Sequence, residues 1–131
     1  MDGLAGVRHV ALTVSDLERS AEWYANVLGL EEQFREVSPS RKAVVFAFPA
    51  GSGGVGLVQH VGSEDRAFDP TVQGLDHVAF RVASPEAMRA WARRLDEHGV
   101  VHSGVIEVPP GQMLNFKDPD GIALALFWDR A

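Results

Sequence analysis

The stretch Arg8-His9-Val10-Ala11-Leu12-Thr13-Val14 (residues 8–14) occurs a second time, with few changes, as DHVAFRV at residues 76–82. The two copies share the frame H-V-A-apolar-x-V, and a glycine, Gly6 or Gly74, lies shortly before each of them. Alternating β-branched and apolar residues of this kind are typical of a strand. A repeated strand in one short chain indicates a duplicated structural unit.

The repeat continues beyond this frame. At nearly the same offset, Phe46-Ala47-Phe48 aligns with Leu114-Asn115-Phe116, and one position further along Val55-Gly56-Leu57 aligns with Leu124-Ala125-Leu126. A register that is kept across half the chain predicts two homologous units at about 5–61 and 74–129. The polar residues 62–73 would connect these units within a single domain that spans 1–131, a length sufficient to bury a core.

Local signals predict the same order of elements in each unit. In the first unit a strand over 9–14 is followed by the helix cap Ser15-Asp16, by apolar residues at helical spacing from Leu17 to Leu28, and by Gly29. In the second unit a strand over 77–82 is followed by the cap Ser84 and a helix that ends near Gly99. Strands are then expected at 43–48, 55–60, 113–116 and 122–128, the last two joined by a turn at Asp118-Pro119-Asp120-Gly121.

Composition narrows the classes of function. The 131 residues contain no cysteine, so disulfides and thiol nucleophiles are absent and any metal must bind His, Asp, Glu or water. The formal net charge of −6 disfavours nucleic acid as a partner. No apolar run is long enough for a membrane span, and the first residues lack the pattern of a secretory signal, so a cytoplasmic location is expected.

The ordered set of motifs HVALTVSDLERSAEWY (9–24), VLGL (27–30), GLDHVAFRV (74–82) and FKDPDG (116–121) resembles the vicinal-oxygen-chelate superfamily, which includes glyoxalases, bleomycin resistance proteins and extradiol dioxygenases. The resemblance covers nearly the whole chain. It implies an α+β fold in which two tandem βαβββ modules form a U-shaped, partly open mixed sheet. It also implies a small-molecule site in the trough between the modules.

The resemblance further implies a divalent metal such as Zn, Ni, Mn or Fe, bound by the first strand of each module and by a carboxylate on a last strand. The first-strand positions are His9 and His77, which become the candidate catalytic residues and metal ligands. The carboxylate positions hold Ala125 and Gly56, neither of which can bind a metal through its side chain. His60, four positions after Gly56 on the same strand face, is the candidate substitute ligand, so the cofactor is either a divalent metal or none.

Strand alternation extends the candidate site to residues that would bind a substrate. Thr13 follows His9, and Arg81 follows His77, at spacings that keep these side chains on the same strand face. The other expected substrate-binding residues are Asn115, Ala125 and Phe127. Strand alternation turns Gln59, by contrast, away from this face.

Three functions fit this pattern. The favoured one is a metal-dependent lyase, isomerase or dioxygenase that acts on a small molecule with adjacent oxygens. A metal-free ligand-binding protein of the bleomycin-resistance type is the first alternative, because Ala125 and Gly56 enlarge and neutralise the trough. The second is a metal-free enzyme of specialised metabolism that uses His9 or His77 as a base. A homodimer is expected in each case, with troughs formed within one chain or by exchange of modules.

Overall fold

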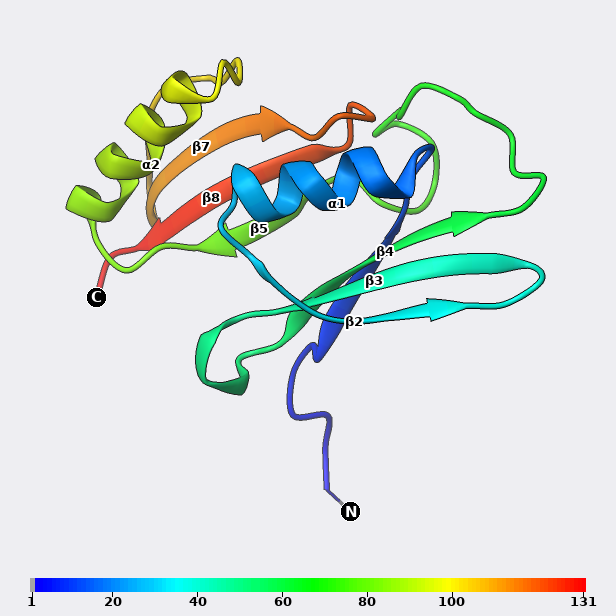
Figure 1. The fold of residues 1–131 in the computed structure, drawn as a ribbon. Helices are drawn as coiled ribbons and strands as arrows, with labels where there is room; N and C mark the ends of the chain where they lie inside the picture. Colours follow the sequence, from blue (N-terminus) through cyan, green and yellow to red (C-terminus); the bar gives the residue numbers. More distant parts are fainter. Residues whose placement is uncertain (1) are drawn as a thin grey trace. The chain divides into compact units, whose positions relative to one another are not determined.

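The computed structural model describes residues 2–131, except for the side chain of Ala50. The chain divides into two compact units, of which the first ends at Asp65 and the second begins at Arg66 (Figure 1). Each unit has the element order βαβββ, and each contains a four-stranded mixed sheet. The α+β class and the duplicated βαβββ modules expected from the sequence are therefore confirmed.

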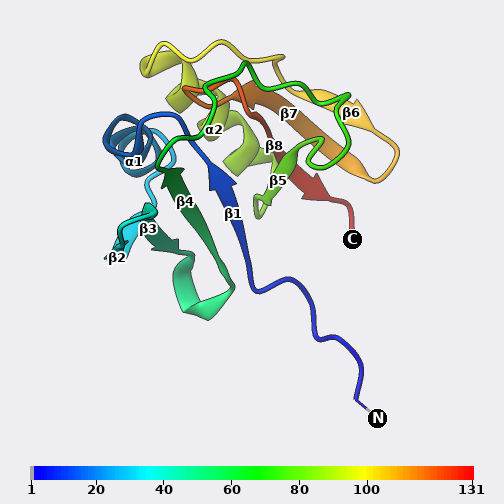
Figure 2. The same cartoon turned by 90° about the vertical axis from the view of Figure 1, so that its right-hand side faces the viewer.

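The first unit contains β1 (His9–Thr13), α1 (Leu17–Asn26), β2 (Glu31–Val37), β3 (Arg41–Ala47) and β4 (Gly54–His60), with a 3₁₀ turn at Pro49–Gly51. Its strands lie in the order β1-β4-β3-β2. Strands β1 and β4 are parallel neighbours, as their arrows show in Figure 2, and the other pairs are antiparallel.

The second unit contains β5 (Val78–Arg81), α2 (Pro85–Glu97), β6 (Ile106–Val108), β7 (Gly111–Lys117) and β8 (Ala123–Asp129). Its strand order, β5-β8-β7-β6, repeats that of the first unit. The parallel pair is again formed by the first and the last strand, β5 and β8. The sequence repeat is therefore also a repeat of topology.

Both helices begin at the residues that the sequence indicates. The Asp16 carboxylate accepts a hydrogen bond from the backbone N–H of Arg19 (3.1 Å), and the Ser84 hydroxyl accepts one from that of Ala87 (3.0 Å). Each side chain satisfies an N–H group that the first helical turn leaves without a partner. Helix α1 ends at Asn26, slightly before the left-handed Gly29 (φ 68°) that was expected to stop it.

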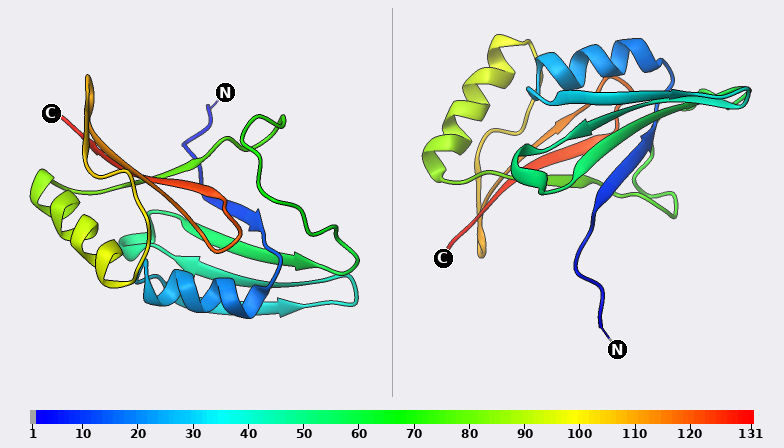
Figure 3. Two further views of the ribbon diagram at one scale, coloured as in Figure 1. Left: turned by 90° about the horizontal axis from the view of Figure 1, so that it is seen from above. Right: turned by 60° about the horizontal axis from the view of Figure 1, so that its bottom comes forward.

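Each helix covers one face of its own sheet. In the first unit α1 contacts β3 and β4 and buries Leu17, Ala21 and Tyr24 (Figure 3). In the second unit α2 contacts β7 and β8 and buries Met88 and Leu95. The side chains that alternate toward the helices make the two cores, namely Leu12, Val44, Phe46, Val55, Leu57, Leu114, Phe116, Leu124 and Leu126. The opposite side of each sheet is called its helix-free face below.

Two strands were not located from the sequence, β2 at Glu31–Val37 and β6 at Ile106–Val108. The alignment of the repeats also needs a correction at the third strand. Val45 pairs with Gly56 as Asn115 pairs with Ala125, so Val45 and not Ala47 is the counterpart of Asn115. Among the described residues, no helix is both long and apolar enough to cross a membrane.

Candidate functional site

The second unit gathers four of the expected site residues on its helix-free face. Ala79, Ala125 and Asn115 are direct neighbours across β5, β8 and β7. Arg81 and Phe127 are neighbours in the next row of the same sheet. Directly opposed residues in a sheet project to one face. The first row therefore presents the small side chains of Ala79 and Ala125, with the amide of Asn115 at one end. Asn115 and Phe127 are half-buried, and Ala125 is buried.

An ion pair lies at the end of this face. The Arg81 Nε atom is 3.6 Å from Oδ2 of Asp129, the last residue of β8. The Arg81 side chain is nevertheless 83% exposed, so its guanidinium remains open to solvent. An exposed pair of this kind contributes little to stability, and its arginine can turn toward an anionic ligand.

The first unit places His9 and Thr13 on its helix-free face. His9 pairs with Gly54, and Thr13 pairs with Val58 of β4. Between them Ala11 pairs with Gly56, the first of the two expected carboxylate positions. His9 and Thr13 are both exposed. Gln59, as expected from strand alternation, turns to the helix side, where its Oε1 accepts a hydrogen bond from the Leu17 backbone N–H (2.8 Å).

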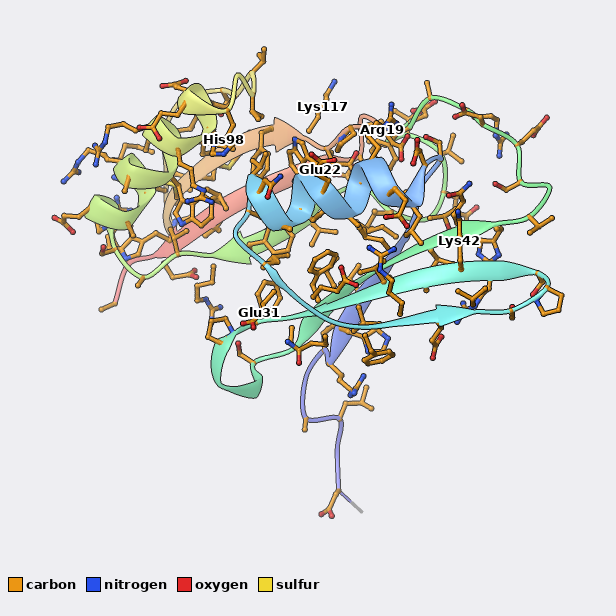
Figure 4. All side chains as sticks on the ribbon, viewed as in Figure 1. Arg19, Glu22, Glu31, Lys42, His98 and Lys117 are labelled. Carbon is orange, nitrogen blue, oxygen red and sulfur yellow. The ribbon has the colours of Figure 1, made fainter. Side chains whose placement is uncertain are left out.

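The structure does not bring His60 near His9. His60 pairs with Arg41, whereas His9 lies in the row of Gly54, six positions earlier on β4. At about 3.3 Å per residue this places the two rows roughly 20 Å apart along the strands. Figure 4 shows the same separation, because Glu31, in the row of His9, and Lys42, next to Arg41, lie toward opposite ends of the β2–β3 pair.

Two residues that the sequence interpretation passed over contact the candidate histidines. Arg8 Nη1 lies 2.9 Å from Nδ1 of His9, and Asp76 Oδ1 lies 2.7 Å from Nδ1 of His77. In the aligned repeats these two positions are equivalent and carry opposite charges, which is the signal that identifies them. The His77 side chain is 53% exposed, so its ring is accessible to a ligand.

The residues present do not fit a metal site with two histidines and one carboxylate. Gly56 and Ala125 carry no donor atom, and His60 lies far from His9 along β4. The contact with Arg8 also occupies Nδ1 of His9, because a guanidinium can only donate. Among the residues that the structure describes, no group of three or more His, Cys, Asp or Glu side chains is arranged to hold a metal.

Several known proteins are similar to this chain in sequence. The sequence model described as the Glyoxalase/Bleomycin resistance protein/Dioxygenase superfamily matches residues 6–126. The uncharacterized protein YaeR of Escherichia coli (strain K12) is 31% identical over an alignment of 133 positions, which covers 97% of this chain and 98% of YaeR. Catechol-2,3-dioxygenase of Bacillus subtilis (strain 168) is 26% identical over 95% of this chain, but the match spans only 41% of that enzyme.

Solved structures agree with this assignment. The crystal structure of a glyoxylase/bleomycin resistance protein/dioxygenase domain from Frankia sp. EAN1pec is 35% identical, with a TM-score of 0.90 over 98% of this chain and 100% of that one. A mutant of the fosfomycin resistance protein FosX from Listeria monocytogenes, complexed with Mn(II) and 1S,2S-dihydroxypropylphosphonic acid, is 20% identical with a TM-score of 0.70. It covers 98% of this chain and 95% of its own, and at this identity the likeness concerns the fold.

Proposed function

The chain belongs to the Glyoxalase/Bleomycin resistance protein/Dioxygenase superfamily, and we propose that it binds a small organic molecule at the helix-free faces of its sheets without a metal held by two histidines and a carboxylate. One observation carries this proposal. Both positions where the family resemblance expects a carboxylate, Gly56 and Ala125, lack any donor atom and lie beside an alanine of the neighbouring strand.

The helix-free face of the second unit supports binding of an organic ligand. Ala79 and Ala125 have small side chains at its centre, Phe127 is an aromatic residue of the next row, and Asn115 and Arg81 supply polar groups. A mainly apolar lining with a few polar groups is typical of small-molecule sites. The guanidinium of Arg81 favours an anionic or oxygen-rich ligand, which it would receive through its planar set of donors.

A metal-dependent enzyme is the second candidate, and one contact favours it. The Asp76 carboxylate lies 2.7 Å from Nδ1 of His77, and histidines that bind metals through Nε2 commonly have such a partner on the other nitrogen. The FosX relative complexed with Mn(II) shares the fold. This candidate lacks an oxygen donor on β4 or β8 at the positions beside Ala11 and Ala79.

Ligand binding before and after metal removal separates the two candidates. Catechol, fosfomycin and dihydroxypropylphosphonic acid would be screened by thermal unfolding with protein as purified and with protein dialysed against EDTA. We expect at least one compound to stabilise both samples equally, by about 2.7 kcal/mol at 100 times its Kd. Stabilisation that disappears with EDTA and returns with Mn(II) would favour the metal-dependent candidate.

Two variants test whether the helix-free face of the second unit is the site. Arg81→Ala and Phe127→Ala are expected to weaken binding of the stabilising compound about tenfold each, because each removes one polar or apolar contact. Arg89→Ala is the matched control, since Arg89 is an exposed arginine on α2 that pairs with Glu86. Equal binding by all three variants would place the site elsewhere.

We further propose that the protein is a cytoplasmic homodimer. Each four-stranded sheet ends in two edge strands, and edge strands provide unpaired backbone groups for association. Light scattering coupled to size-exclusion chromatography tests this state directly, and a mass equal to one chain of 14.2 kDa would refute the dimer.

A further inference from the structure

The outer edge of the second sheet is irregular beside Asn115. Ile106 of β6 pairs with Met113 of β7. Four residues before Ile106, His102 forms an isolated bridge with Phe116, which lies only three residues after Met113. The outer segment therefore carries one extra residue between these two pairs. Such a β-bulge bends a strand locally and often lies next to a functional site.

Ser103, inside this bulge, is hydrogen-bonded to both backbone groups of Asn115. The Ser103 N–H donates to the Asn115 carbonyl oxygen, and the Ser103 hydroxyl accepts from the Asn115 N–H, each at 2.9 Å. The same hydroxyl donates to the Gly104 carbonyl oxygen at 2.8 Å. The hydroxyl thus takes the place of the backbone acceptor that a regular strand would offer to Asn115.

The bulge is also connected to helix α2. The Gly104 N–H donates to Nδ1 of His102 (2.9 Å), and Nε2 of the same ring lies 2.8 Å from Oδ1 of Asp96 on α2. The His102 side chain is only 12% exposed. Gly104 has a φ of 76°, in the left-handed region that favours glycine. These contacts fix the conformation of the segment that presents Ser103 to β7.

The first unit has a bulge at the corresponding place. Glu32 of β2 pairs with Phe46 and Phe34 pairs with Val45, so β2 also carries one extra residue between two pairs. Val45 is the counterpart of Asn115. The bulge therefore belongs to the repeat, but it lies beside an apolar side chain in the first unit and beside an amide in the second.

The amide of Asn115 is available to a ligand. The residue is half-buried, beside Ala125 on the helix-free face of the second unit. Within residues 2–131, the hydrogen bonds of Asn115 to Ser103 use its backbone groups, and its side-chain amide has no hydrogen-bond partner. Two strand spacings and two residues separate Asn115 from Arg81, which corresponds to about 12 Å between their Cα atoms.

We propose that Ser103 is a positioning residue, which orients the Asn115 amide toward a hydroxyl group of the ligand. An amide both donates and accepts, so it can bind a hydroxyl in either sense. With Arg81 at the other end of the face, the preferred ligand carries a hydroxyl and, apart from it, an anionic group. This ligand preference rests on the proposed function, whereas the orientation of Asn115 by Ser103 does not.

Two probes that differ by one hydroxyl test the ligand preference. Both 4-hydroxybenzoate and benzoate carry a carboxylate for Arg81 and a ring for Phe127, and 4-hydroxybenzoate adds the hydroxyl for Asn115. We expect the unaltered protein to bind 4-hydroxybenzoate about fivefold more tightly, the gain of one ordinary hydrogen bond. Equal affinity for the two probes would overturn the preference.

A double-mutant cycle tests whether Ser103 acts through Asn115. Asn115→Ala and Ser103→Ala should each remove most of the preference for 4-hydroxybenzoate, leave benzoate binding unchanged, and have no additive effect when combined. Ser103→Thr keeps the hydroxyl and should retain the preference. Ser63→Ala, at an exposed serine of the first unit, is the matched control. Additive losses, or an unchanged preference in Ser103→Ala, would overturn the role of Ser103.

The orientation of Asn115 is measured on the ligand-free protein. Three-bond couplings of its side chain report the population of each rotamer. We expect one dominant rotamer in the unaltered protein and in Ser103→Thr, and a mixture in Ser103→Ala. Identical populations in all three would overturn the positioning role.

These measurements separate failure of this inference from failure of the proposed function. If neither benzoate probe binds but a compound screened above does, the ligand preference is overturned and the proposed function stands. If no compound binds, the proposed function fails, while the rotamer populations still decide whether Ser103 orients Asn115.

Discussion

Two buried polar side chains illustrate opposite ways of placing an oxygen in the interior. Ser20, on the sheet side of α1, is fully buried, and its hydroxyl has no hydrogen-bond partner among the residues that the structure describes. Asp118, at the turn between β7 and β8, is 6% exposed, and its Oδ1 accepts from the backbone N–H groups of Asp120 and Ile122 at 2.9 Å each. A buried polar atom without a partner is costly, whereas a satisfied one holds its surroundings in place.

Replacement of the unsatisfied hydroxyl should stabilise the protein. We expect Ser20→Ala to raise the free energy of unfolding by about 1 kcal/mol, because it removes a desolvated oxygen and introduces a better helix former. Urea titration followed by circular dichroism measures the change. The comparison variant Ser84→Ala, which removes a helix cap, should lower stability by about 1 kcal/mol. A loss of stability in Ser20→Ala would indicate that the hydroxyl has a partner, such as a buried water.

Removal of the Asp118 carboxylate should have the reverse effect. Asp118→Ala leaves the N–H groups of Asp120 and Ile122 without their acceptor, and we expect it to lower the unfolding free energy by about 1–3 kcal/mol. Asp118→Asn keeps one acceptor oxygen and should lose clearly less. Equal losses in the two variants would show that charge, and not hydrogen bonding to the turn, is what this position requires.

At the scale of elements, a side chain from β4 is hydrogen-bonded to the first turn of α1. The Gln59 amide oxygen accepts from the Leu17 backbone N–H, one of the groups that a first helical turn leaves free. We expect Gln59→Ala to destabilise the protein by about 1 kcal/mol and to increase amide hydrogen exchange at Leu17. His60→Ala, a change at the neighbouring exposed residue, should stay within about 0.5 kcal/mol. Unchanged exchange at Leu17 would contradict this role of Gln59.

The second strand of the first unit shows what sequence patterns do not predict. All seven residues of β2 are exposed, so no alternation of apolar and polar residues marks it as a strand. Arg35 forms exposed ion pairs with Glu32 on the same strand and with Glu18 on α1. The hydrogen bond from Arg35 lowers the pKa of Glu32 below its ordinary value. Strands β1 and β5, by contrast, alternate clearly, and they were located to within a residue.

At the scale of the molecule, duplication made much of the architecture predictable. The repeated HVA frame indicated the modules, and strand parity correctly placed Thr13 with His9 and turned Gln59 to the other side. Distances along a strand were harder to predict, because parity does not show that His60 lies at the opposite end of β4. The contacts of Arg8 and Asp76 with Nδ1 depend on side-chain rotamers, which no periodic pattern encodes.

Introduction of a carboxylate at position 125 tests the proposal that the protein binds its ligand without a metal. We expect Ala125→Glu to be less stable than the unaltered protein without metal, because position 125 is buried and a carboxylate there lacks compensation. If His77 is competent as a ligand, Mn(II) should restore part of that stability in the variant and have no effect on the unaltered protein. Thermal unfolding with and without Mn(II), together with elemental analysis, measures both. One metal ion per chain in the unaltered protein would contradict the proposal.

The acidic character of β2 has a consequence for the protein at high concentration. Three of its seven residues are glutamates, Glu31, Glu32 and Glu36, and the strand forms an edge of its sheet. When two molecules bring this edge together, the net negative charge of the strand opposes backbone pairing. This edge therefore disfavours aggregation by strand pairing between molecules. The proposed dimer is expected to form through another part of the surface.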